Sequence, residues 1–299
     1  MIPLARSLRL DRPVAIRATY GLHGHGPGDP TIRIEADGVW RASATPDGAA
    51  TIHLRFDGTR VEAAAWGPGA TWLMDRAELL VGLADSSTLV TTHPRLRELQ
   101  RQLSGLRIVA THRVMEALVP AILEQKVTSY EAHQSFRKLV YALGEPAPGP
   151  MPLRVAPEPS VLAEQPYWVF HRFGVERKRA DVIRAVCARS SRLEECVDLP
   201  KEEAWARLTH FTGVGPWTAA EVAARAMGDS DAVSVGDFHL PHLVAWVLAG
   251  EDRATDARML ELLEPYRGER GRVIRLIESG AGRRPRRAPR QRIRSIERI

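Results

Sequence analysis

The stretch "HFTGVGPWTAAEVAARAM", residues 210–227, decides the fold class of this chain of 299 residues. Gly213 and Gly215 stand two positions apart, and Pro216 and a helix-forming run follow them. Glycine permits positive φ angles and leaves backbone amides uncovered, and proline suits the first position of a helix. Residues 201–211 before the turn also have helical spacing. The stretch therefore predicts two helices joined by a tight turn.

The second helix of this unit begins with uncovered N–H groups and the positive end of its dipole, an arrangement that suits a phosphate. A dinucleotide site would need a preceding strand and a third glycine, but Ala219 and Ala220 follow the turn. The Gly-Lys-Ser/Thr sequence of a phosphate loop is also missing. A backbone phosphate of a nucleic acid, held without reading its sequence, fits better. The alternative is a tight turn with no ligand.

Working outward, "AVSVGDFHLPHLVAWVL" (residues 232–248) follows, and it places Asp237 just before another helix. An aspartate there is expected to cap the helix N-terminus. Its nearness to the glycine turn suggests a second, chemical role. His239 and His242 share a helix face, and together with Asp237 they could form a metal site. Asp237 would then have to fill two roles at once, one of them as a metal ligand. We therefore expect no metal.

Residues 14–72 predict antiparallel β-structure. "TIRIEADGVWRA" and "TIHLRFDGTRVEA" alternate apolar and polar residues and turn at Asp37-Gly38 and Asp57-Gly58. A short helix near Met74 should end this unit by residues 83–87. From His93 the apolar spacing becomes helical, interrupted by a Pro-rich linker or long loop at 144–159. We predict an N-terminal β-rich domain at 1–90, a helical domain at 91–282 and a tail at 283–299.

Composition narrows the class of protein. The chain is 44% hydrophobic and 26% charged, as is ordinary for a soluble globular protein. No apolar run approaches the roughly 18 residues of a membrane span, and the N-terminus does not resemble a signal peptide. Two cysteines, Cys187 and Cys196, argue against a disulfide framework, a four-cysteine zinc site or an iron–sulfur cluster. We expect a cytoplasmic protein that does not bind membranes.

The net charge of +6 is concentrated in the tail. Residues 283–299 hold eight arginines and one glutamate, whereas residues 1–282 hold 34 Lys+Arg against 35 Asp+Glu. Such a Pro/Arg-rich run cannot bury a core, and we expect it to be disordered. It is either a non-specific arm for nucleic acid or a solubilising tail.

Three segments together resemble the helix-hairpin-helix (HhH-GPD) DNA glycosylases, and among them the bacterial 3-methyladenine DNA glycosylase II type. "LTHFTGVGPWTA" looks like the hairpin, "VSVGDFHLP" like the segment with the essential aspartate, and "ALVPAILEQKVT" like an early helix that ends in a Gln-containing loop. The resemblance covers roughly residues 10–280. It implies an α+β fold, in which an antiparallel β-rich domain precedes a mostly α-helical, two-lobed glycosylase domain.

The resemblance also implies a monomeric, nucleoid-associated enzyme that needs no cofactor and binds double-stranded DNA containing damaged bases. It would flip an alkylated purine out of the duplex and hydrolyse its N-glycosidic bond. Asp237 would be the catalytic carboxylate, and Trp217, Tyr266 and Glu221 would line the base pocket. The DNA-binding set would be Gly213, Val214, Gly215, Thr218, Gln125 and Lys126. Relatives that also cut the strand have a lysine at the position of Trp217, so the chain should be monofunctional.

Several positions depart from the family pattern and leave alternatives open. Trp217 could stack on a cationic base or serve only in core packing. Glu221 could favour a cationic base or lie on a solvated helix face. Lys126 replaces an apolar wedge and could reach a phosphate instead. Gly236 replaces a second acidic residue. The alternative functions are a DNA-binding protein without catalysis and a glycosylase for a deaminated or oxidised base.

Overall fold

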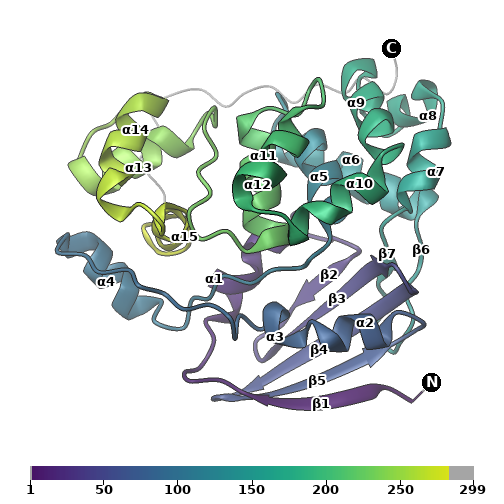
Figure 1. Cartoon of the computed structure of the whole chain (residues 1–299), viewed down its shortest axis with the longest axis horizontal. Coiled ribbons are helices and arrows are strands. Elements are labelled where there is room, and N and C mark those ends of the chain that lie inside the picture. Colours follow the sequence, from purple (N-terminus) through teal and green to yellow (C-terminus); the bar gives the residue numbers. More distant parts are fainter. Residues whose placement is uncertain (1, 283–299) are drawn as a thin grey trace.

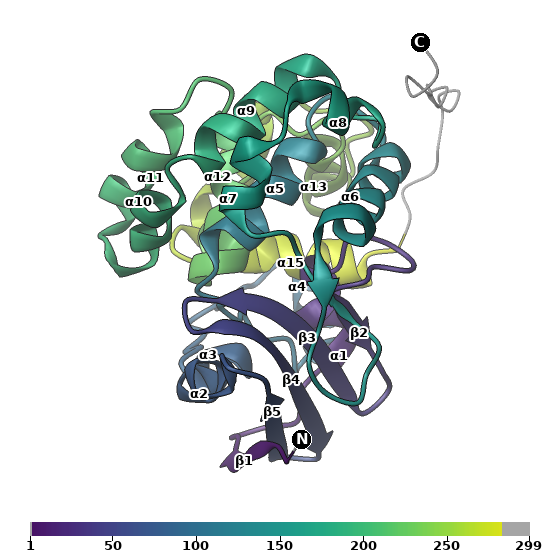
Figure 2. The ribbon, with the colours of Figure 1, turned by 90° about the vertical axis from the view of Figure 1, so that its right-hand side faces the viewer.

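The computed structural model describes residues 2–282, and in it an antiparallel sheet lies beneath a layer of helices (Figures 1 and 2). The sheet has the strand order β1-β5-β4-β3-β2, so its consecutive strands β2 to β5 form a meander. Its strands are β1 (Leu4–Arg9), β2 (Ile32–Ile34), β3 (Gly38–Thr45), β4 (Gly48–Asp57) and β5 (Arg60–Trp66). The predicted α+β class, with β-structure first and helices after, is confirmed.

Both predicted hairpin turns are present. β2 pairs with β3 across the turn that ends at Gly38, and β4 pairs with β5 across Asp57-Gly58. The predicted start of the β-structure at residue 14 is wrong. The strand β1 begins at Leu4, and residues 16–20 form a helix. All but one of the residues of β1 are exposed, so no burial imposes alternation on its sequence LARSLR.

The helices follow the sheet, except for α1 (Ile16–Tyr20), which lies between its first two strands. Two short helices, α2 (Ala70–Asp75) and α3 (Ala77–Leu80), cover one face of the sheet. The others are α4 (Pro94–Gln102), α5 (Val114–Leu123), α6 (Ser129–Leu143), α7 (Pro159–Glu164), α8 (Tyr167–His171), α9 (Arg177–Cys187), α10 (Ser190–Glu194), α11 (Lys201–Thr209), α12 (Pro216–Val222), α13 (Leu240–Ala249), α14 (Asp256–Leu263) and α15 (Arg270–Gly280).

The Pro-rich segment after α6 is more than a linker. It forms a small ladder of β6 (Glu145–Pro146) and β7 (Arg154–Val155). Leu153 and Val155 from this ladder pack on Trp40 and Trp66, on the side of the sheet that α2 and α3 leave uncovered. The segment therefore ties the helical part of the chain to the sheet.

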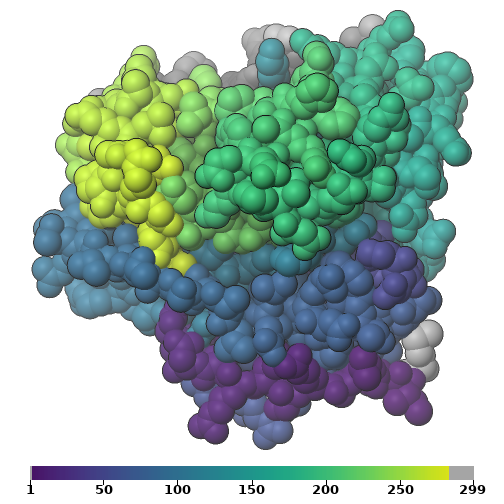
Figure 3. Space-filling view, viewed as in Figure 1, coloured from purple at the N-terminus to yellow at the C-terminus, as the bar shows by residue number. Residues whose placement is uncertain are grey.

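The helices pack around two separate cores, as expected for two lobes. The central core is formed by α5 to α12, and its members include Leu118, Phe170 and Val222. The second core is formed by α4 together with α13 to α15, and includes Leu96 and Ile277. The two groups lie side by side above the N-terminal part of the chain (Figure 3). The domain limits at residues 90 and 282 stay predictions, and the predicted tail at 283–299 lies outside the described residues.

The connection from α12 to α13 crosses from the central core to the second core (Figure 1). It begins after a π-helical turn, Ala223–Met227, that continues α12 directly. Residues 228–239 then lead to α13, and Asp237 lies in this crossing segment. Within residues 2–282, no helix is long and apolar enough to cross a membrane.

Candidate functional site

The glycine turn joins α11 and α12 as the sequence predicts. Gly213 has φ +95°, and a Cβ on it would stand 2.4 Å from Cγ2 of Val182. Gly215 differs, because its φ of −97° suits any residue and a Cβ added to it would have no neighbouring atom within 4 Å. Pro216 opens α12, and the first helical bond there runs from the Ala219 N–H to the Gly215 carbonyl. The amides before it lack partners inside the helix.

The difference between Gly213 and Gly215 provides a matched pair of alanine variants. Gly213→Ala is expected to destabilise the fold by about 1–3 kcal/mol, because it combines an unfavourable φ with a clash against Val182. Gly215→Ala should change the free energy of unfolding by less than about 0.5 kcal/mol. Urea unfolding of the two variants and the wild type measures both values. Equal stability of the two variants would contradict the assigned roles of the glycines.

Asp237 lies at the start of α13, where three N–H groups converge on its carboxylate. Oδ1 accepts hydrogen bonds from the backbone N–H groups of His239 (2.7 Å) and Leu240 (2.8 Å). Oδ2 accepts one from Nε1 of Trp217 at 3.1 Å. The predicted N-cap position is wrong, because His239 occupies the N-cap of α13; Asp237 lies two residues earlier and accepts the N–H groups of His239 and Leu240 from outside the helix. The bond to Trp217 joins the two segments that sequence reasoning singled out, 20 residues apart.

Trp217 is half-buried in the first turn of α12. Its indole N–H is directed at the carboxylate of Asp237, which orients the ring toward the crossing segment. A tryptophan at this position supplies a hydrogen-bond donor and a flat apolar face, but no amine. The side chain therefore holds Asp237 from one side and remains partly open to solvent.

The Gln-containing loop between α5 and α6 is fastened to the hairpin. Nε2 of Gln125 donates to the carbonyl of Gly213 and to Oγ1 of Thr218, both at 2.9 Å. Lys126 is exposed and has φ +57°, which is rare for a residue other than glycine. A capping box formed by Thr128 and Glu131 then starts α6. The loop thus presents Lys126 outward beside the turn.

The same loop is anchored to the N-terminal part of the chain through Glu124. Oε1 of Glu124 lies 3.6 Å from Nδ1 of His25 and 4.0 Å from Nε2 of His133. Burial alone would raise the pKa of Glu124, but the hydrogen bond from His25 and nearby cations lower it below its usual value. Glu124, the residue before Gln125, thus joins the loop to His25 in the N-terminal part of the chain and to His133 on α6.

Two members of the predicted DNA-binding set have buried side chains. Val214 is 4% exposed and belongs to the central core, and Thr218 is 2% exposed and accepts the bond from Gln125. Side-chain contact with DNA is therefore not their role here. They support the turn from inside, and a DNA contact at these positions would have to use the backbone.

Glu221 lies one turn after Trp217 on α12, with both of its carboxylate oxygens in use. Oε2 pairs with Arg225, and Oε1 accepts the hydroxyl hydrogen of Ser234. Its side chain is only 15% exposed, so a solvated helix face does not describe it. Its role in the base pocket stays a prediction.

Tyr266 lies apart from the hairpin contacts. It ends the short helical turn Glu264–Tyr266, and its ring packs against the second core. Its hydroxyl is 3.2 Å from Oγ1 of Thr91. No hydrogen bond between described residues joins Tyr266 to Trp217 or Asp237, so its place in the base pocket stays a prediction.

Sequence reasoning missed Phe238, which follows Asp237, and the two residues Ser234 and Arg225 that contact Glu221. Phe238 is 80% exposed, and its ring meets that of His239 edge-on at 4.9 Å. An exposed aromatic directly after the aspartate was visible in the sequence but not weighed. Ser234 and Arg225, the partners of Glu221, carried no signal, because neither the 13-residue separation of Ser234 nor the burial of Arg225 can be read from spacing.

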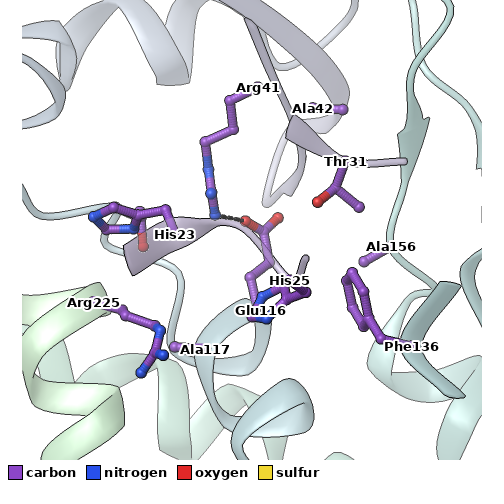
Figure 4. Close-up of a pocket in the computed structure, with 11 residues that line it drawn as sticks. His23, His25, Thr31, Arg41, Ala42, Glu116, Ala117, Phe136, Ala156 and Arg225 are labelled. Atoms are coloured by element: carbon purple, nitrogen blue, oxygen red, sulfur yellow. Dashed lines mark hydrogen bonds and ion pairs between the residues drawn. The ribbon is translucent and has the colours of Figure 1, made fainter. Parts of the chain in front are cut away.

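A small cavity lies elsewhere, where the sheet meets the central helices (Figure 4). Polar side chains at its wall include His23, His25, Arg41, Glu116 and Arg225, and Arg41 pairs with Glu116 at 2.6 Å. Its volume of about 20 Å³ has room for about one water molecule. It does not include Trp217 or Asp237 and cannot hold a nucleobase.

Within the described part of the chain, no three His, Cys, Asp or Glu side chains are grouped so that they could hold a metal ion. His242 accepts the N–H of Ala254 at its Nδ1, and the Asp237 carboxylate accepts hydrogen bonds from N–H donors.

No family model matches the chain. Among curated proteins, a Bacillus subtilis protein with the name of a DNA-3-methyladenine glycosylase is 22% identical over 170 residues, which is 54% of this chain and 58% of the relative. The AlkA protein of Mycobacterium tuberculosis, named as a bifunctional transcriptional activator/DNA repair enzyme, is 32% identical over 154 residues. That match covers 49% of this chain and 30% of the relative.

Solved structures match over nearly the whole length. The 3-methyladenine DNA glycosylase of Archaeoglobus fulgidus aligns with a TM-score of 0.73 and 18% identity, over 91% of this chain and 97% of that one. The chain has the fold of the helix-hairpin-helix DNA glycosylases. A Clostridium acetobutylicum 8-oxoguanine glycosylase/lyase, solved with double-stranded DNA, shares this fold with a TM-score of 0.70 and 13% identity, over 92% and 96% of the chains.

In this helix-hairpin-helix fold, α11, the Gly213–Gly215 turn and α12 form the hairpin unit. The crossing segment brings Asp237 to its first turn. Within the fold, the chain resembles the 3-methyladenine glycosylase II type.

Proposed function

We propose that the chain is a DNA glycosylase that excises alkylated purines of the 3-methyladenine type from double-stranded DNA. The observation that carries the proposal is the bond between Trp217 and Asp237, which places an aromatic ring and a carboxylate together beside the hairpin. None of the ion pairs between described residues includes Asp237. A carboxylate held by N–H donors, and not neutralised by a cation, remains available to a developing positive charge.

The chemistry would proceed on a base flipped out of the duplex, because the bond to be broken is unreachable inside the stack. As the bond between the sugar and the base breaks, its electron pair leaves with the cationic alkylated purine, which departs neutral. Positive charge then builds on the sugar, and Asp237 stabilises it. Water adds to the sugar carbon and passes its proton to Asp237 and from there to solvent. The products are a free base and an abasic site.

The contacts with DNA would come from the Gly213–Gly215 turn and from the neighbouring loop between α5 and α6. The uncovered amides at the start of α12 would take a backbone phosphate. Gln125 would hold the turn in place through its bonds to Gly213 and Thr218. Lys126, exposed next to it, would reach a second phosphate or enter the duplex. These contacts read no sequence, as a search for damage requires.

We further propose that the enzyme leaves the strand intact. Strand cutting through a Schiff base needs an amine, and the residue beside Asp237 on α12 is Trp217. One assay tests both statements. Duplexes with a methylated, a deaminated or an oxidised purine are incubated with the protein, and abasic sites are revealed by alkali, with and without borohydride. We expect abasic sites from the methylated duplex and no borohydride-trapped complex.

Each other outcome of this assay would support an alternative function or reaction of the protein. Excision of only the deaminated or oxidised base would replace the proposed substrate. A trapped complex would contradict the monofunctional reaction. DNA binding without any abasic sites would favour a helix-hairpin-helix protein that binds DNA without catalysis.

A further inference from the structure

Two side chains on one face of α12 reach the crossing segment. Trp217 and Glu221 are four residues apart and therefore lie above one another on the helix. Trp217 donates to Asp237, and Glu221 accepts the hydroxyl of Ser234. Ser234 and Asp237 are themselves joined, because the Asp237 N–H donates to the Ser234 carbonyl at 3.3 Å. The residues from Ser234 to Asp237 are thus fastened to α12 at both ends.

Packing holds this part of the crossing segment at Val235, which is partly buried against the second core. Gly236 has φ +96° and no atom near enough to contact an added Cβ. Val235 and Asp237 are half-buried, and Gly236 between them is exposed. Besides the two links to α12 and the bonds to the His239 and Leu240 amides, the segment has hydrogen bonds from the Gly236 N–H to Asp256 at 3.2 Å and from the Val235 N–H to the Val233 carbonyl at 2.9 Å. The position of Asp237 therefore depends on hydrogen bonds more than on packing.

Arg225 extends this connection away from α12. It pairs with Glu221, and its Nε donates to the carbonyl of Leu22 at 3.0 Å. Leu22 belongs to the short 3-10 helix Gly21–His23 before β2, and Arg225 lines the cavity together with His23 of that helix (Figure 4). Burial alone would lower the pKa of Arg225, but the carboxylates of Glu221 and Glu124 raise it above its usual value. Arg225 thus links the N-terminal part of the chain to Glu221.

We propose that Glu221, Ser234 and Arg225 are positioning residues that set the place of the Asp237 carboxylate. This inference rests on the proposed function, since it concerns the same site. Arg225 fixes and offsets the charge of Glu221, and Glu221 holds Ser234. Ser234 in turn holds the segment that ends in Asp237. Glu221 acts on the reaction through this connection, and not through direct attraction of a cationic base.

Ser234→Ala tests the connection with little risk to folding, because it removes one hydroxyl. The protein offers a matched control in Ser7→Ala, since Ser7 also donates to a glutamate, Glu62, at 3.2 Å on the far edge of the sheet. We expect Ser234→Ala to lower the single-turnover rate of excision about tenfold, because misplaced catalytic groups lose rate steeply. Affinity for DNA containing an abasic site should stay within about twofold. Ser7→Ala should change neither value.

A double-mutant cycle tests whether Glu221 and Ser234 act through the same connection. Glu221→Gln keeps an oxygen for Ser234 but loses the charge that holds Arg225, so its rate should fall as well. The double variant Ser234→Ala/Glu221→Gln should be no slower than the slower single variant, because both changes break one connection. Rate losses that multiply, or a Ser234→Ala variant as fast as wild type, would overturn the proposal.

A readout that needs no activity separates this proposal from the proposed function. The indole N–H resonance of Trp217, assigned by its loss in Trp217→Phe, reports the bond to Asp237. Ser234→Ala should shift this resonance and Ser7→Ala should not. If the resonance shifts but wild type excises no base, the connection stands and the proposed function fails. An unchanged resonance overturns the connection whatever the activity.

Discussion

Asp237→Asn is expected to lower the single-turnover rate of base excision about 10³-fold. Asparagine keeps one oxygen that can accept the amides of His239 and Leu240, so its hydrogen bonds to the start of α13 should survive. It loses the negative charge that stabilises the sugar cation, and its NH₂ group cannot accept the indole N–H of Trp217. DNA affinity should therefore stay within about threefold while the chemical step slows.

The measurement is a rapid-quench time course with enzyme in excess over methylated duplex, together with a binding titration on duplex containing an abasic site. Asp57→Asn is the matched control, because Asp57 is an exposed aspartate at the end of β4, remote from the site. It should behave as wild type. An Asp237→Asn variant that excises at the wild-type rate would show that another group stabilises the cation.

Trp217→Ala should lower the same rate about 10²-fold, the second largest effect we expect. The change removes both the donor to Asp237 and the flat ring against which a cationic base would stack. Trp217→Phe keeps a ring but loses the N–H donor, so a fall of about tenfold is expected. The rates should rank wild type, then Phe, then Ala.

Thermal unfolding of these variants distinguishes the two interpretations of Trp217. If the side chain serves only in core packing, the Ala variant will lose stability while its excision rate at low temperature stays close to that of wild type. Equal rates for the Phe and Ala variants would show that the ring contributes nothing beyond its hydrogen bond.

Much of the fold was predictable because its signals are local. The Asp-Gly turns between alternating segments predicted the β2–β3 and β4–β5 hairpins of the sheet. The strand β1 was missed because it is exposed at the sheet edge and its sequence does not alternate. The small ladder after Gly144 was missed because it is held by long-range packing on Trp40 and Trp66.

The site was predictable only in its outline. The spacing between the glycine turn and Asp237 indicated that the two segments cooperate, and the bond from Trp217 joins them. The role of Gln125 as a tie to the hairpin, and of Ser234 as a partner of Glu221, depends on contacts across 88–93 and 13 residues. Hydroxyl and amide side chains have no pattern that predicts their partners at such separations.

The most direct test of the central claim is the release of free base. Duplex DNA carrying 3-methyladenine is incubated with the protein, and the small-molecule fraction is analysed by chromatography and mass spectrometry. We predict that free 3-methyladenine appears in step with abasic sites, and that Asp237→Asn releases almost none in the same time. Wild-type protein that binds this duplex but releases no base would contradict the claim.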